Sequence, residues 1–94
     1  MAEIAPDAEM NMWPNPNRGD LVYLSVNAVP EEVLTVSVDI FDMFGKRVMA
    51  NTIATQGGFI NTVLNLNGDL AAGMYMVNIT VGEKVTTHRL VIQP

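Results

Sequence analysis

The stretch "VLTVSVDIFD", residues 33–42, alternates apolar and polar side chains and decides the fold class. Successive side chains of a β-strand point to opposite faces, so a period of two places one set inward and the other toward solvent. The predicted inward face consists of Leu34, Val36, Val38 and Ile40. The opposite face carries Thr35, Ser37 and Asp39. The stretch therefore predicts a half-buried β-strand.

The same period of two recurs on both sides of this stretch. In "LVYLSV", residues 21–26, the predicted inward side chains are Val22, Leu24 and Val26. In "GMYMVNITV", residues 73–81, they are Tyr75, Val77, Ile79 and Val81, with Met74, Met76, Asn78 and Thr80 on the other face. Weaker alternation predicts strands at 8–13, 46–54, 59–66 and 84–92.

Turn signals separate these ranges at short spacing. The segment "DMFGK", 42–46, places Asp42 at the first position of a type I turn and Gly45 at the fourth. Gly82-Glu83 is a tight hairpin candidate between the last two predicted strands. No stretch shows a helical period. We therefore predict an all-β fold, a small antiparallel seven-stranded β-sandwich of immunoglobulin-like, Greek-key type.

The segment "WPNPNRGD", 13–20, is also interpreted as a turn. Pro16 fixes its φ near −65°, which suits the second position of a turn, and Gly19 supplies an unusual backbone angle. The tripeptide Arg18-Gly19-Asp20 resembles an adhesion signal, but its flanking residues already require it as a turn.

Composition bounds the function. Ninety-four residues make one domain, and a content of 49% hydrophobic and 16% charged residues is not that of a disordered segment. The net charge of −5, with five scattered basic residues, argues against nucleic-acid binding. No apolar run is long enough to span a membrane, and the acidic N-terminus does not have the pattern of a signal peptide. The absence of cysteine excludes disulfides and thiolate chemistry.

Catalysis and metal binding find little support. His88 is the single histidine of the chain, and carboxylates do not cluster near it in the sequence. Neither Ser25 nor Ser37 lies in a nucleophile-elbow pattern. We therefore predict no catalytic residue, no metal site and no cofactor. A deep pocket around His88 with two carboxylates would favour an enzyme instead.

Several large apolar residues are predicted on the surface. Met74 and Met76 lie opposite the inward face of their strand, while Met43 and Phe44 lie at the tip of a turn. Methionine-rich surfaces suit adaptable contacts. Two interpretations stay open: these four residues form an apolar contact surface, or they are buried, with Phe44 folded back on the sandwich.

The order of four motifs resembles a known family. An aromatic residue followed by Pro14-Asn15-Pro16 and Gly19 comes first, and Asp42…Gly45-Lys46-x-Val48 marks a central turn. Leu70-Ala71-Ala72-Gly73-Met74-Tyr75 leads into the penultimate strand, and Arg89-Leu90-Val91-Ile92 comes near the end. Over residues 10 to 93 the chain resembles the type IX secretion system, or Por-type, C-terminal sorting domain of type A.

The resemblance implies a function without catalysis. Such a domain belongs to an exported protein, is recognised by the outer-membrane type IX translocon and is usually removed by a surface sortase-like peptidase. It implies passage through the periplasm to the cell surface or the medium. Residues 1–9 would be the linker from an upstream cargo domain, and residues 10–94 the sorting domain.

The resemblance also assigns residues. Pro14, Asn15, Pro16, Gly19, Asp42, Gly45, Gly73 and Tyr75 would shape the fold, and Arg89, Leu90, Val91 and Ile92 would be read by the translocon. We expect the last strand to offer unpaired backbone groups for pairing with a partner strand, and the sequence allows the isolated domain to dimerise. The alternative is a carbohydrate-binding or stalk module of a secreted enzyme, which a surface platform of Trp13 and Tyr23 would favour.

Overall fold

The computed structural model describes residues 9–93, and every regular element in this range is a β-strand. The strands are β1 (Glu9–Trp13), β2 (Leu21–Asn27), β3 (Thr35–Phe41), β4 (Arg47–Ala54), β5 (Ile60–Asn65), β6 (Gly73–Val81) and β7 (Lys84–Ile92). The predicted all-β class with seven strands is confirmed. The predicted linker, residues 1–9, lies outside the described residues except for Glu9, which begins β1.

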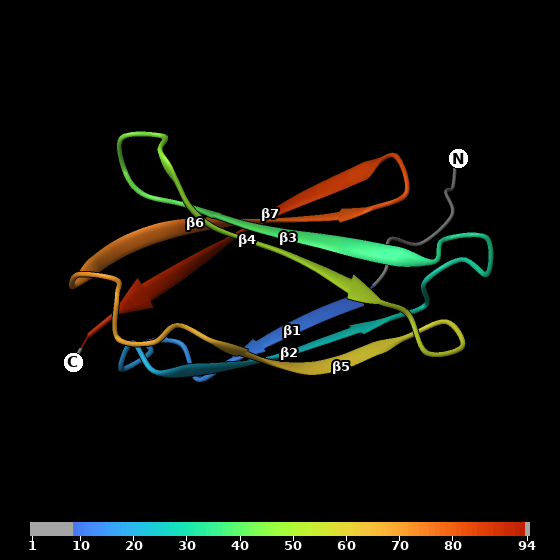
Figure 1. Ribbon diagram of the computed structural model, residues 1–94, viewed down its shortest axis with the longest axis horizontal. Coiled ribbons are helices and arrows are strands. Elements are labelled where there is room, and N and C mark those ends of the chain that lie inside the picture. The colour runs from blue at the N-terminus through green and yellow to red at the C-terminus, as the bar shows by residue number, and fades with distance from the viewer. Residues whose placement is uncertain (1–8, 94) are drawn as a thin grey trace.

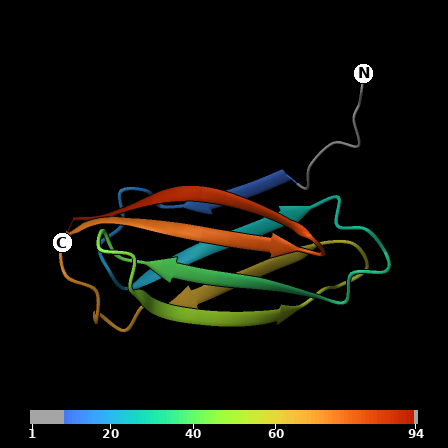
Figure 2. The ribbon, with the colours of Figure 1, turned by 90° about the horizontal axis from the view of Figure 1, so that it is seen from above.

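The strands form two antiparallel sheets that stack as layers (Figure 1). One sheet has the order β1-β2-β5 and the other the order β4-β3-β6-β7. The chain therefore crosses between the layers after β2, β4 and β5, as in a Greek key. Seen from above, the strands of one layer run obliquely over those of the other (Figure 2). These features confirm the predicted immunoglobulin-like sandwich.

The core consists of the inward side chains of both sheets. Its members are Val22, Leu24, Val26, Val29, Val36, Val38, Ile40, Ile60, Leu64, Leu66, Leu70, Tyr75, Val77, Ile79, Leu90 and Ile92. The inward sets predicted for residues 21–26 and 73–81 are confirmed, although Val81 is only partly buried. Burial of one large aliphatic side chain stabilises the fold by about 1.5–3 kcal/mol. The alternating apolar residues therefore strongly favour the arrangement in which both sheets turn these faces toward each other.

The prediction that Leu34 faces the core is wrong. Leu34 is 73% exposed and precedes β3, which begins at Thr35. The backbone of residues 30–33 turns instead, because the Val33 N–H donates to the Pro30 carbonyl. Val33 packs against the core in place of Leu34. A period of two holds only where the backbone is extended, and here the strand starts at Thr35, two residues later than predicted.

The two ends of the sandwich differ in the segments they carry. Strand directions place the loops 14–20, 42–46 and 66–72 at the end where β7 finishes, which we call the C-terminal end. The start of β1 and the loops 28–34, 55–59 and 82–83 lie at the opposite end, which we call the N-terminal end. The beginning of β1 and the end of β7 are therefore far apart (Figure 1). Three of the four sequence motifs lie partly or wholly in the C-terminal loops.

Candidate functional site

The loop 14–20 is organised around the side chain of Asn17, which is fully buried. Its Nδ2 donates to the carbonyl oxygens of Pro14 at 3.1 Å and Leu21 at 2.8 Å, and its Oδ1 accepts from the Gly19 N–H at 2.7 Å. A buried amide is stable only when its donors and acceptors are paired, and here they are. Asn17 therefore fixes the loop, although the sequence motif assigned it no role.

Glycine is favoured at position 19 by the backbone conformation of the loop. Its φ of +93° lies in the region that disfavours other residues, as predicted for this turn. An added Cβ would also lie 3.4 Å from Cγ2 of Ile92 in the last strand. The middle residue of the adhesion-like tripeptide is buried, so the tripeptide is not displayed as an extended tip.

Residues 15–17 are hydrogen-bonded to the last strand over the segment 89–93. The side-chain amide of Asn15 donates from Nδ2 to the Arg89 carbonyl at 2.7 Å, and its Oδ1 accepts from the Val91 N–H at 3.0 Å. The Asn17 N–H donates to the Val91 carbonyl at 2.7 Å, and the Gln93 N–H donates to the Asn17 carbonyl at 2.6 Å. We call this arrangement the latch. Each bond contributes about 0.5–1.5 kcal/mol net.

The latch corrects the expectation that the last strand ends with unpaired backbone groups. Its outer edge from Arg89 to Gln93 is hydrogen-bonded to residues 15–17, including a parallel bridge between Asn17 and Ile92. Upstream of Arg89, β7 pairs with β6 alone among the described strands, which leaves the backbone edge at Val85 and Thr87 open. The sequence missed the latch because it joins segments about seventy-five residues apart.

The four residues predicted for recognition divide into two pairs. Leu90 and Ile92 are buried in the core, with exposed fractions of 0% and 1%. Arg89 is exposed and Val91 is half-buried on the outer face of the sheet. Only the second pair can contact a partner while the domain is folded.

The motif around Gly73 and Tyr75 closes the loop that leads into β6. Tyr75 faces the core as predicted, and its hydroxyl donates to the Ala71 carbonyl at 2.7 Å. The same loop is tied to the segment 19–20, because the Leu66 N–H donates to the Asp20 carbonyl and the Gly68 N–H donates to the Gly19 carbonyl. The first, third and fourth motifs thus meet at the C-terminal end.

The central turn is formed as predicted. The Gly45 N–H donates to the Asp42 carbonyl at 3.1 Å, and the Asp42 carboxylate accepts from the N–H groups of Phe44 and Lys46, each at 2.9 Å. Phe44 is 94% exposed at the tip and does not fold back on the sandwich. Met43 is exposed beside it, Met76 is exposed on the outer face of β6, and Met74 is half-buried there.

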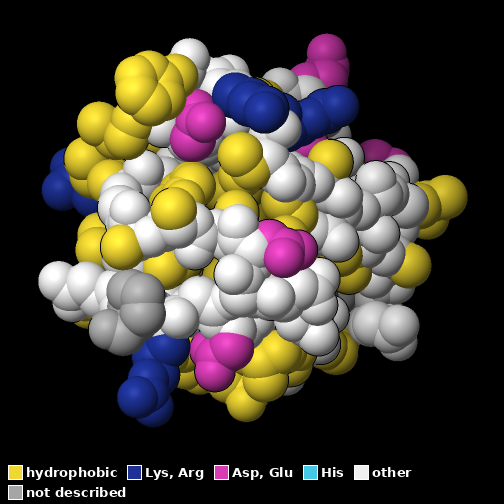
Figure 3. Space-filling model, turned by 60° about the vertical axis from the view of Figure 1, so that its left-hand side comes forward, with side chains coloured by type: hydrophobic (Ala, Val, Ile, Leu, Met, Phe, Trp, Pro, Cys, Tyr) yellow, Lys and Arg dark blue, Asp and Glu magenta, His cyan; other side chains and the backbone are white. Residues whose placement is uncertain are grey.

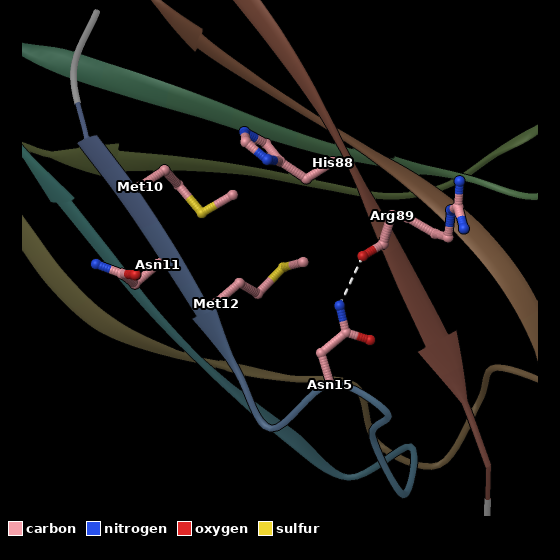
Figure 4. A pocket seen from close by; sticks show the side chains of 6 residues that line it. All are labelled: Met10, Asn11, Met12, Asn15, His88 and Arg89. Carbon is pink, nitrogen blue, oxygen red and sulfur yellow. Dashed lines mark hydrogen bonds between the residues drawn. The ribbon is translucent and has the colours of Figure 1, made fainter.

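A shallow groove of about 300 Å³ separates the edges β1 and β7 (Figure 4). The side chains of Met10, Met12, Asn15 and His88 point into the space between the two strands (Figure 4). The His88 Nε2 lies 3.1 Å from the Thr86 hydroxyl, and burial lowers the pKa of His88 below its usual 6.5. No carboxylate lines the groove. The arrangement that would favour an enzyme is therefore not present at His88.

Other kinds of site are also unsupported in the described range. Residues 9–93 contain no group of three His, Cys, Asp or Glu side chains able to hold a metal ion. The segment "NLNGD", residues 65–69, forms a turn held by a local bond, because Asn65 Oδ1 accepts from the Asn67 N–H at 2.9 Å. Within the described part of the chain, no helix is long and apolar enough to cross a membrane.

An aromatic pair lies on the outer face of the β1-β2-β5 sheet. Trp13 and Tyr23 are cross-strand partners whose rings stack with centroids 5.8 Å apart and planes 19° apart. Both side chains are partly exposed. This is the surface platform whose presence favours the alternative, non-sorting function.

The comparisons with known proteins agree with the motif order. A family model described as the secretion system C-terminal sorting domain matches residues 11–93, nearly the whole chain. No curated protein matches the chain. The matched range includes both sides of the latch, the central turn and the Tyr75 loop. The chain belongs to the family of secretion system C-terminal sorting domains, the sorting signals of type IX secretion.

Proposed function

We propose that this domain is recognised, in its folded form, by the outer-membrane type IX translocon and carries an upstream cargo domain across that membrane. The latch is the observation that supports the proposal. It joins Asn15 of the first motif and the nearby Asn17 to the last motif, so the two ends of the family pattern form one surface only after folding. A receptor that serves many cargoes can then test for a folded domain.

In this proposal Arg89 and Val91 contact the translocon, whereas Leu90 and Ile92 hold the strand in place. Arg89 is exposed and Val91 lies on the outer face, while the other two side chains are core residues. The backbone of residues 89–93 is already hydrogen-bonded to residues 15–17 in the latch. Recognition would therefore use side chains and shape, and strand addition would first require release of residues 15–17.

The domain performs no catalysis in this proposal. A surface sortase-like peptidase cleaves within or just upstream of residues 1–9, which releases the cargo at the cell surface or into the medium. The route passes through the periplasm. The start of β1 lies at the N-terminal end, opposite the latch, so cleavage there would leave the latch untouched (Figure 1).

A secretion assay tests the proposal. Residues 1–94 are fused behind a signal peptide and a fluorescent reporter, in a bacterium with a type IX system and in its translocon-null strain. We expect the reporter at the surface or in the medium of the first strain alone. Reporter retained in the periplasm of both strains contradicts the proposal.

The recognition residues need point variants instead of a truncation. Removing residues 89–94 also removes two core side chains, so a truncated domain would fail by unfolding. Arg89→Glu combined with Val91→Ser keeps the core and should lower export. Val85→Ser, an exposed residue earlier on the same strand, is the matched control.

A second candidate function is carbohydrate binding. The stacked Trp13 and Tyr23 lie among outward amide and hydroxyl side chains, namely Asn11, Ser25, Asn61 and Asn65. Exposed aromatic rings with nearby amides suit a sugar ring, although each ring already gives one face to the other. Affinity electrophoresis in polysaccharide gels would show retardation that Trp13→Ala with Tyr23→Ala removes and Phe59→Ala keeps. No retardation in any gel eliminates this candidate.

A further inference from the structure

Side chains from β3, β6, β7 and one turn form a single apolar surface at the C-terminal end. The register pairs Met74 with Val91 and Phe41 with Met76, all on the outer face of the four-stranded sheet. The turn that follows Phe41 adds the remaining two residues. We call this set the apolar surface: Phe41, Met43, Phe44, Met74, Met76 and Val91. Figure 3, which brings this end forward, shows hydrophobic side chains gathered over it.

The turn holds the backbone of Phe44 in a fixed position. Four hydrogen bonds link Asp42 to the backbone of the turn, two through its carboxylate and two through its own N–H and C=O. The Phe44 ring is nevertheless 94% exposed and Met43 is 62% exposed. An aromatic side chain on a rigid turn loses little conformational freedom when it enters a pocket, which is a property of strong binding anchors.

Cations border the apolar surface. Lys46 and Arg47 follow the turn directly, and Arg89 is the cross-strand partner of Met76. Figure 3 shows Lys and Arg side chains at the margin of the hydrophobic side chains. Carboxylates lie in the loops of both ends, at Asp20, Asp42 and Asp69 and at Glu31, Glu32 and Glu83, whereas four of the five cations, Arg18, Lys46, Arg47 and Arg89, lie toward the C-terminal end. The charge distribution therefore distinguishes the two ends of an otherwise acidic domain.

We propose that the apolar surface docks this domain onto a protein of the outer-membrane type IX machinery, through an apolar recess bordered by acidic side chains. Phe44 enters the recess, Met43 and Met76 contact its walls, and Lys46 and Arg89 pair with the carboxylates of the partner. This inference rests on the proposed sorting function. It goes beyond it because it identifies an apolar contact surface that extends from Val91 across β6 to the central turn.

A protein partner fits better than a lipid surface. The chain has a net charge of −5, which opposes approach to an anionic membrane. Arg47 is already engaged by Asp39 at 3.5 Å, and Asp42 lies at the base of the turn. The Asp39 carboxylate offsets the charge of Arg47, and the remaining border cations, Lys46 and Arg89, do not form the cluster of basic residues that binds anionic lipid.

The same secretion assay, with surface variants, tests the inference. Phe44→Ser combined with Met76→Ser should lower translocon-dependent export about tenfold or more, the scale expected when an anchor is removed. Leu34→Ser, which changes a 73% exposed apolar residue at the N-terminal end, should leave export unchanged. Thermal unfolding of each purified domain checks that the variants fold. Equal export of the double variant and the unchanged domain overturns the inference.

The outcomes separate this inference from the proposed function. If the unchanged domain is not exported, or is exported without the translocon, the proposed function fails and the inference fails with it. If the unchanged domain is exported and Lys46→Glu lowers export more than Lys46→Gln, the acidic recess is supported. Equal effects of the two lysine variants would show that the recess of the partner is not bordered by acidic side chains.

Vesicle flotation tests the lipid alternative. The purified domain is mixed with phosphatidylglycerol–phosphatidylcholine vesicles and centrifuged through a density gradient. We expect the domain to stay at the bottom of the gradient. If the unchanged domain floats with the vesicles and the Phe44→Ser variant does not, the apolar surface binds lipid and the proposal of a protein partner is wrong.

Discussion

The side-chain amide of Asn15 accepts a hydrogen bond from the Val91 N–H at 3.0 Å. Its Nδ2 donates to the carbonyl of Arg89, two positions earlier in the same strand, at 2.7 Å. The amide thus bonds to the edge of β7 as a peptide group of a neighbouring strand would. The last strand is covered at its end by this side chain and by a single backbone bridge from Asn17, and not by an eighth strand.

Asn15→Ala should lower the free energy of unfolding by about 1–3 kcal/mol, because two hydrogen bonds are lost and water can replace them in part. Chemical denaturation of the purified domain measures the change. Asn61→Ala, on the exposed face of β5, is the control and should change stability by less than about 0.5 kcal/mol. A loss equal to that of the control would show that the latch contributes nothing to stability.

Asn17→Ala should be more severe than Asn15→Ala, at about 2–4 kcal/mol, because the side chain is fully buried and satisfies three backbone groups. The same denaturation experiment ranks the two variants. Hydrogen exchange should also accelerate at Gly19 and Gln93, whose N–H groups depend on Asn17. Unchanged exchange at both amides would contradict the role given to Asn17.

Gly19→Ala and Gly45→Ala should differ, although both positions have positive φ. At Gly45 no heavy atom lies within 4 Å of an added Cβ, so only backbone strain of about 1–2 kcal/mol is expected. At Gly19 the Cβ would also lie 3.4 Å from Cγ2 of Ile92, the close limit of van der Waals contact, so the packed core leaves it little room to relax the backbone strain. The Gly19 variant should therefore lose more stability. Equal losses would mean that backbone conformation alone requires glycine there.

His88 should make a small pH-dependent contribution to stability. Burial lowers its pKa in the folded state, so the unfolded state binds the proton more readily. Its contribution to stability is thus present above pH 6.5 and is lost as the pH falls through the folded-state pKa. The unfolding free energy of His88→Gln should fall less than that of the unchanged domain across this range. Parallel pH profiles would contradict this assignment.

The stability of point variants should distinguish the outward residues of the last motif, Arg89 and Val91, from the inward residues, Leu90 and Ile92. Leu90→Ala should cost about 2–5 kcal/mol, since the side chain is fully buried in the core. Val91→Ala, on the outer face, should cost clearly less. Urea midpoints of the two variants give the comparison. A Val91 variant as unstable as the Leu90 variant would show that the outer face is packed.

The sequence by itself determined the fold class and the position of every strand. A period of two is a local property, because the geometry of an extended chain sends alternate side chains to opposite faces. For this reason Val22, Val38 and Val77 could be placed in the core without any knowledge of their neighbours. The same rule placed Leu34 inward wrongly, since whether the backbone is extended there depends on the turn at residues 30–33.

Only the tertiary structure decided which surfaces exist. The latch, the apolar surface and the Trp13–Tyr23 pair each join segments that are distant in the chain or lie on separate strands. Their formation depends on strand order and register, which the alternation of single strands does not encode. The order of the four motifs identified the family, because the motifs are distributed over nearly the whole chain. The residues able to meet a partner became visible only once the two sheets had closed, leaving Leu90 and Ile92 inside and Arg89 and Phe44 outside.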